Sequence, residues 1–424
     1  LSPEELDNRL RCLPLAHGVR HFKNGISTLS QISGKERKEM ACVLLACLVG
    51  KVSKETMITF RSLLDFIYLA QYPTHDDDTL RYLEKALQTF HANKDVLIKL
   101  GIRDDFNIPK IHSLLHYKQA IRLFGTTDNY NTEMFERLHI EFAKDAWRAT
   151  NHRDEFPQMV RWITRNEKMA LYEAFQKERS LEDQAQDEED EPEDGDPGSP
   201  ADGAAAAPDG NTTDVVESTM GITIAKYPPA PQQHLAAIQD RHHAPGFTAA
   251  LAQYINVLQP QELRLTRGEL SQTWLPFTRL DVYHKYKFKP CSLHDGKEEV
   301  SVIKAIPASG RTGRKDRFDT AIVLDTEDAE STGVQGTRVG RVKVLFKLPR
   351  ILPQNQGGRP APAWWPTGPL AYVEWYTKFA PAAADPAHLM YSVRKQPLAA
   401  NGLPQGKIIP LSQIRQSCQL IPTF

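Results

Sequence analysis

The stretch that decides the fold of the C-terminal half reads Val282-Tyr283-His284-Lys285-Tyr286-Lys287-Phe288. Apolar and basic residues alternate along it, which is typical of a strand with one buried and one solvated face. Further short apolar runs lie at 300–306, 320–324, 340–346, 370–375, 390–393 and 408–411, separated by Gly, Pro and Asp. They predict a β-rich small barrel or sandwich over about 280–424.

Towards the N-terminus, the sequence of residues 234–258 predicts one or two helices. The segment before these helices has a different composition. From Glu182 to Asp196 there are ten acids and no base, followed by Pro, Gly, Ser and a run of Ala. So little apolar surface cannot offset the entropy lost on ordering. We therefore expect a disordered linker over 181–220.

Residues 1–180 have the apolar periodicity of helices. It predicts helices at 35–49, 54–71, about 79–100, 109–124, 133–148 and 156–179, with Asp76, Asp77 and Asp78 at a helix N-terminus. Cys42 and Cys47 are expected in the helical core. The fold class is therefore α+β, with a helical domain at 1–180, the linker at 181–220, and a helical lead-in plus basic β-rich domain at 221–424.

Charge is unevenly distributed along the chain. The formal net charge is −1, but residues 261–424 contain 23 Lys and Arg against 14 Asp and Glu, a net of +9. This asymmetry favours a nucleic-acid partner. The five cysteines form no CxxC pair, which argues against a zinc finger or a disulfide framework, and no run of eighteen apolar residues predicts a membrane span.

The most informative motifs lie between residues 110 and 162. They read KIHSLLHY from Lys110, FGTTDNYNTEMFERLHI from Phe124 and AKDAWRATNHRD from Ala143. These blocks resemble the closing part of the transposase core of fungal Plavaka elements, which are relatives of the CACTA group of DNA transposons. Residues 13–27, 370–376 and 409–422 resemble the same family, so the resemblance extends over most of the chain outside the linker.

The resemblance implies a helical part of an RNase H-like core whose catalytic set is Asp-Asp-Glu. In that chemistry two Mg²⁺ (or Mn²⁺) ions bridge the scissile phosphate, and carboxylates hold them. The family pattern makes Glu136 the first choice and Glu133 the second for the third acid and metal ligand. Without the resemblance, both residues are interpreted as acids in the first turn of a helix, where the helix dipole stabilises negative charge. On the same helix, four side chains are candidate DNA contacts: Arg137, His139, Lys144 and Arg148.

The two catalytic Asp residues should precede the third acid on strands. Residues 1–130 show no strand pattern that carries an Asp, and 20–125 look like the long helical insertion of the family. We therefore expect the two Asp upstream of Leu1. On this expectation the chain is inactive as a nuclease and binds no metal tightly.

The C-terminal domain offers further candidate DNA contacts. Lys285, Lys287 and Lys289 alternate with Tyr283, Tyr286 and Phe288, a pattern that suits a groove tracking phosphates and stacking bases. Phosphate contacts are also expected from a basic loop that contains Arg311, Arg314, Lys315 and Arg317. A solvated strand face and a solvated loop are the alternatives.

Three smaller motifs are more ordinary. His112 with His116, and His242 with His243, have no third ligand at useful spacing, so packed or surface histidines are expected. The Trp364-Trp365 pair is expected to pack, a partner-binding patch being the alternative.

The sequence therefore predicts the C-terminal portion of a DDE-type DNA transposase, located in the nucleus, with double-stranded DNA at transposon ends as partner. A homo-oligomer is allowed for, and no membrane association is expected. The alternative is a non-catalytic nuclear protein, derived from a transposon, that binds DNA or protein.

Overall fold

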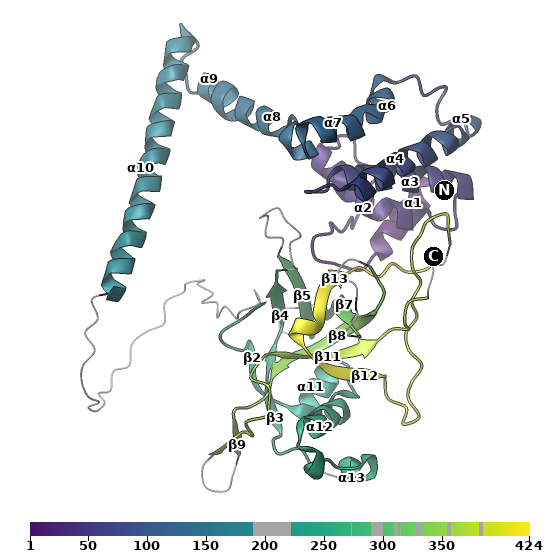
Figure 1. Ribbon diagram of the computed structural model, residues 1–424, viewed down its shortest axis with the longest axis vertical. Coiled ribbons are helices and arrows are strands. Elements are labelled where there is room, and N and C mark those ends of the chain that lie inside the picture. Colours follow the sequence, from purple (N-terminus) through teal and green to yellow (C-terminus); the bar gives the residue numbers. More distant parts are fainter. Residues whose placement is uncertain are drawn as a thin grey trace. The chain divides into compact units, whose positions relative to one another are not determined.

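The computed structural model describes residues 1–189, 222–272, 274–289, 300–308, 313, 315–326, 329, 333–353, 358–380 and 385–424. The predicted α+β class is confirmed: the N-terminal half is helical and the C-terminal part forms antiparallel sheets (Figure 1). Packing divides the chain into two units, one made of 1–118 with 212–424 and the other of 119–211. The sequence boundaries 1–180, 181–220 and 221–424 stay a prediction.

The first four helices of the first unit begin at residues whose side chains cap the helix. Ser33 and Asp76 each form a capping box, and Ser2 caps a first helix that the sequence reading missed. The three aspartates do mark a helix start. The helices are α1 (Pro3–Cys12), α2 (Gly34–Leu48), α3 (Lys54–Ala70), α4 (Asp77–Asn93), α5 (Val96–Lys99) and α6 (Pro109–Ser113). After a 3-10 turn η1 (Leu114–His116), α7 (Tyr117–Phe124) runs across the boundary into the second unit.

One cysteine prediction is wrong. Cys47 is fully buried, but Cys42 is exposed. Five residues at 3.6 per turn place the two thiols on different sides of α2. The Cys42 thiol instead donates to the backbone carbonyl of Lys38 at 3.3 Å.

The second unit contains helices that differ from the expected ones. The single helix predicted over 133–148 is divided into α8 (Glu133–His139), a π-helical turn η3 (Ile140–Asp145) and α9 (Ala146–Arg148). After a bend where His152 and Asp154 adopt positive φ, α10 (Glu155–Glu189) continues as one long helix (Figure 1). It reaches into the first nine residues of the expected linker; the rest of that linker lies outside the described residues.

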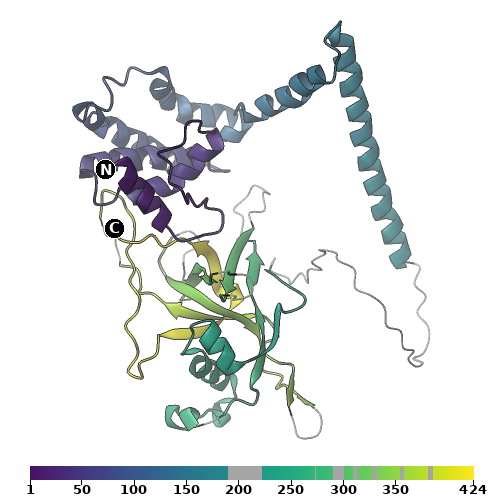
Figure 2. The same cartoon turned by 180° about the vertical axis from the view of Figure 1, so that it is seen from behind.

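The strands of the C-terminal part form two main antiparallel sheets, seen from both sides in Figures 1 and 2. The four-stranded sheet has the order β1 (Ile222–Ile224), β4 (Lys285–Phe288), β5 (Ser301–Ile306) and β6 (Arg317–Phe318). The seven-stranded sheet contains β2 (Ala230–His234), β3 (Arg279–Tyr283), β7 (Thr320–Leu324), β8 (Thr337–Lys347), β11 (Leu370–Trp375), β12 (Gly406–Pro410) and β13 (Ile414–Cys418). A separate hairpin joins β9 (Ile351–Pro353) and β10 (Gly358–Pro360).

The predicted strand at 390–393 is wrong. Those residues belong to an irregular segment, and the residues after it contact the end of β11 through a bridge between Lys395 and Tyr376. The short apolar run there has no alternation that would bury one face, so it lacks the pattern that holds a strand in a sheet.

Two apolar clusters lie on opposite faces of the seven-stranded sheet. One fills the space between the two sheets and includes Tyr286, Ile303 and Val342. The other packs the seven-stranded sheet against α11 (Leu235–Arg241) and α12 (Phe247–Leu258), with Phe247 and Tyr372 at its centre. A short helix α13 (Arg267–Gln272) follows α12. The result is three layers: helices, large sheet, small sheet.

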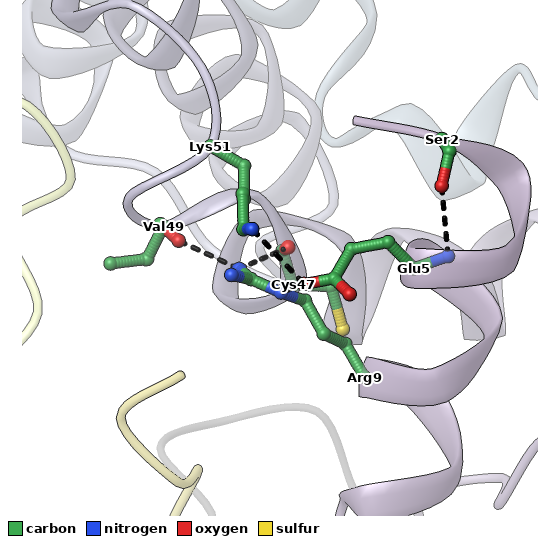
Figure 3. Close-up of polar contacts among 6 residues, drawn as sticks. All are labelled: Ser2, Glu5, Arg9, Cys47, Val49 and Lys51. Carbon is green, nitrogen blue, oxygen red and sulfur yellow. Dashed lines mark hydrogen bonds and ion pairs between the residues drawn. The ribbon is translucent and has the colours of Figure 1, made fainter.

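A buried arginine joins the first two helices (Figure 3). The Arg9 side chain on α1 is 4% exposed, and one terminal nitrogen donates to the carbonyls of Cys47 at 3.0 Å and Val49 at 2.7 Å. Its Nε donates to the Glu5 carboxylate at 3.1 Å, and Lys51 pairs with the same carboxylate. Arg9 thus satisfies carbonyls at the C-terminal end of α2, where a helix leaves acceptors without intrahelical partners.

We expect Arg9→Met to lower the free energy of unfolding of the full chain by about 3 kcal/mol, because it leaves two carbonyls without their donor. Glu5 is partly solvated, so the matched change Glu5→Gln should lower the free energy of unfolding much less than Arg9→Met does. Urea unfolding followed by circular dichroism measures both. Equal losses for the two variants would contradict this role for Arg9.

A second packing constraint surrounds the buried Tyr372 hydroxyl. A Cβ placed on Gly246, which caps α12, would lie 2.6 Å from that oxygen, and one on Gly406 in β12 would lie 2.5 Å from it and 2.6 Å from the ring carbons. Gly246 has φ of −82°, so its backbone suits any residue and space alone requires glycine.

Gly246→Ala should destabilise the chain by roughly 1–3 kcal/mol through overpacking. Adding Tyr372→Phe should restore most of that loss, because the clash is with the hydroxyl. Gly406→Ala should not be rescued by the same change, because its clash includes the ring. Urea unfolding of the single and double variants measures these differences, and equal rescue at both glycines would contradict the packing described.

Candidate nucleic-acid interface and acidic helix

The four-stranded sheet presents a basic outer face. On β4 the side chains of Tyr286 and Phe288 are buried, whereas Lys285, Lys287 and, directly after the strand, Lys289 are exposed. The alternation of the sequence is therefore realised as predicted, and it sets the apolar and basic side chains on opposite faces. The aromatic rings belong to the core between the sheets, so the expected base-stacking role of these aromatics is wrong.

Strand pairing adds a lysine that the sequence reading missed. In the β4–β5 register Lys285 lies directly across from Lys304, and Lys287 lies across from Val302 on one side and Thr223 on the other. Burial, followed by the charges of Arg317 and Lys285, lowers the pKa of Lys304, while Asp319 opposes this. Pairing the two predicted strands as an antiparallel hairpin would have placed Lys304 beside Lys285 from the sequence.

Like charges directly opposite each other on adjacent strands are destabilising. The salt bridges among the described residues include neither Lys285 nor Lys304. The sheet therefore holds two cations side by side, Lys285 exposed and Lys304 half-buried, with the exposed Lys287 next along the strand. A polyanion laid over this face would offset the repulsion.

The predicted basic loop is only partly described. Arg311 and Arg314 lie outside the described residues, and Lys315 is exposed. The Arg317 Nε donates to buried Asp319 at 2.7 Å, and the same carboxylate accepts from the backbone N–H of Lys304 at 3.0 Å. Arg317 is thus engaged in holding β5 and β6 together.

The helix expected to carry the third acid is α8. The Glu133 side chain lies outside the described residues, and Glu136 is exposed, with its backbone N–H bonded to the carbonyl of Thr132 at 2.9 Å. Thr132 precedes the helix as expected but makes no side-chain capping hydrogen bond. Over the part of the chain that the structure describes, no three His, Cys, Asp or Glu side chains gather as a metal would need. The described residues therefore do not fit a two-metal centre.

The four cations predicted on this helix differ in their surroundings. His139 and Lys144 are exposed. Arg137 lies 3.8 Å from Glu141, and Arg148 pairs with Asp145 at 2.9 Å. The π-helical turn η3 contains Lys144 and lies between His139 and Arg148, and its wider turn rotates the later side chains away from the register of one continuous helix.

The residues of the smaller motifs either pack in the core or lie on the surface. His112 and His116 are exposed, with ring centroids 5.1 Å apart. Trp365 is buried against Phe277, as expected, whereas Trp364 is 46% exposed. No helix among the described residues has the length and apolar character needed to cross a bilayer.

A family model for a domain of unknown function, DUF6830, matches residues 203–387. No curated protein and no solved structure matches the chain. The match covers the basic sheet, but β12 and β13, which pair with β11 and β7, lie beyond it. The folded β-rich domain therefore extends past the matched segment to at least Cys418.

His242 is a buried group with no role at the basic face. It is 3% exposed, and its Nδ1 donates to the carbonyl of Lys343 at 2.7 Å, while the ring lies against Phe318. Burial is the main cause that lowers its pKa to about 4, opposed by the hydrogen bond to Lys343 and reinforced by the nearby charges of His284, Lys343 and Arg241. Folding therefore favours the neutral imidazole.

Because the folded pKa lies below the unfolded value of about 6.5, the unfolded state binds the proton first as the pH falls. Stability contributed by neutral His242 is present above pH 6.5 and is lost between about pH 6.5 and pH 4, by up to roughly 3 kcal/mol. In His242→Asn the amide can donate to the same carbonyl but does not titrate, so the free energy of unfolding should fall less as the pH is lowered. This loss is measured as the free energy of unfolding from pH 7 to pH 4.5. Parallel pH profiles for the unaltered chain and the His242→Asn variant would contradict the role given to His242.

Proposed function

We propose that this chain is the C-terminal part of a DDE-type DNA transposase of the Plavaka kind, acting in the nucleus, and that its β-rich domain binds duplex DNA. The observation that carries the DNA-binding proposal is the basic outer face of the small sheet, where Lys285 and Lys304 lie opposite each other beside Lys287. The transposase assignment is supported by the resemblance in residues 110–162.

The chemistry of this face suits a phosphate backbone. DNA binding is dominated by cations that replace condensed counterions, and such contacts require exposed side chains in a row. The exposed residues of β4 form that row, while the opposite side of the strand is fixed in the core by Tyr286 and Phe288. A rigid strand holds the lysines at constant spacing, which lowers the entropy lost when they meet phosphates.

DNA binding by this chain requires no catalytic step. Glu136 remains the first candidate for a third acid and Glu133 the second, but one or two acids on a single helix turn cannot hold two Mg²⁺ or Mn²⁺ ions. DNA binding through the basic face serves a catalytic transposase and its non-catalytic derivative equally.

The test is binding of the full chain to a short labelled duplex, measured by fluorescence anisotropy from about 50 to 200 mM salt. The triple change Lys285→Gln, Lys287→Gln, Lys289→Gln should weaken binding at least tenfold and reduce the slope of log K against log salt by about 2–3, at about 0.9 per lost phosphate contact. Using both random duplexes and the DNA that flanks the gene adds a test of preference for element ends.

Two controls separate binding from folding and from total charge. Lys85→Gln, Lys99→Gln, Lys110→Gln removes three exposed cations from the helical segment and should leave the slope nearly unchanged. Lys285→Gln alone should leave the unfolding free energy unchanged or raise it by about 0.5 kcal/mol, because it removes the like-charge pair with Lys304. No binding by the unaltered chain at 50 mM salt, or equal effects of the two triple changes, would refute the proposal.

A further inference from the structure

Helix α10 carries a basic stripe that the sequence reading passed over. Arg161, Arg165 and Lys168 follow one another at spacings of four and three, which places them on one side of the helix. Tyr172, four residues further, lies on the same side and is 62% exposed. All three cations are exposed, and with Tyr172 they line an open depression on the helix surface.

The stripe is free of acids. At about 100° per residue, Glu155, Glu167, Glu173 and Glu178 each lie roughly 100° or more around the helix axis from the centre of the stripe. The salt bridges of the described residues include none of its three cations. Cations at i, i+4 and i, i+3 repel one another and weaken a helix by a few tenths of a kcal/mol per pair. The helix therefore keeps an unfavourable concentration of positive charge on one side.

We propose that this stripe binds the phosphate backbone of duplex DNA, as a second contact surface separate from the basic face of the small sheet. The inference rests on the proposed function, because it takes DNA as the partner. Arg161 and Lys168 are about 10 Å apart along the helix axis, close to the length of three base-pair steps. Arginine also suits phosphate oxygens because its planar group donates two parallel hydrogen bonds.

The other side of α10 argues against an anionic membrane as the occupant. Away from the stripe α10 carries the apolar residues Ile163 and Leu171, but Glu167 and Glu178 lie between these two around the helix axis. A helix lying in a membrane surface buries its apolar face in the acyl boundary. Here that burial would carry two carboxylates into the lipid, whereas contact with DNA leaves them in water.

The test variant is Arg161→Gln, Arg165→Gln, Lys168→Gln in the full chain, since glutamine keeps a good helix propensity. We expect duplex binding to weaken at least tenfold at 0.1 M salt and the salt slope to fall by about 2–3. The change Lys85→Gln, Lys99→Gln, Lys110→Gln is the charge-matched control and should bind as the unaltered chain does. Circular dichroism should show equal helix content in all three.

The outcomes separate this inference from the proposed function. If the unaltered chain binds no duplex at low salt, the proposed function fails and this inference with it. If the chain binds and the β4 triple change weakens binding, but the α10 change does not, this inference alone is overturned. It is also overturned if the α10 change leaves DNA binding intact and abolishes capture by phosphatidylserine vesicles. Losses that add when the two triple changes are combined would support two separate surfaces.

Discussion

Strand β8 is the constraint on which the β-rich domain depends. Along one edge its residues pair with β11, and along the other its first half pairs with β7 and its last three residues with β3. It is eleven residues long, about 37 Å at 3.4 Å per residue. A shorter strand could not join both neighbours. Eight of its eleven residues are buried, because apolar clusters cover both faces, and Val342, Val344, Leu345 and Phe346 belong to those clusters.

The basic face follows from how the chain leaves this sheet. After β3 pairs with β8, only His284 separates it from β4, which belongs to the other sheet. The same extended run thus contributes Val282 to one apolar cluster and Tyr286 to the other. Once Tyr286 and Phe288 point into the space between the sheets, period-two alternation leaves the intervening lysines no inward position. Packing of the core therefore fixes where the charges lie.

The sequence was informative where one local signal decides the structure. Apolar periodicity located α2 closely, the three aspartates from Asp76 located the start of α4, and alternation located β4. The sequence was less informative where the position of a residue depends on the strand that pairs with it. The closeness of Lys304 to Lys285 needs the hairpin register, and the engagement of Arg317 with Asp319 needs β6 to lie beside β5. The exposure of β4 aromatics could not be judged without the second sheet that covers them.

Net charge is a poor guide to this chain because its charges are segregated. At 0.1 M salt a charge acts over about 10 Å, so a nearby row of cations matters more to a phosphate than the total of −1. The ten acids from Glu182 to Asp196 cancel cations in the sum, although Lys168 lies fourteen residues before the first of them and the lysines of β4 lie about ninety residues after the last. Both basic surfaces are built the same way: a regular element with its cations on one side and its acids elsewhere or absent. Regular backbone geometry converts a spacing in the sequence into a local positive field, which a neutral composition conceals.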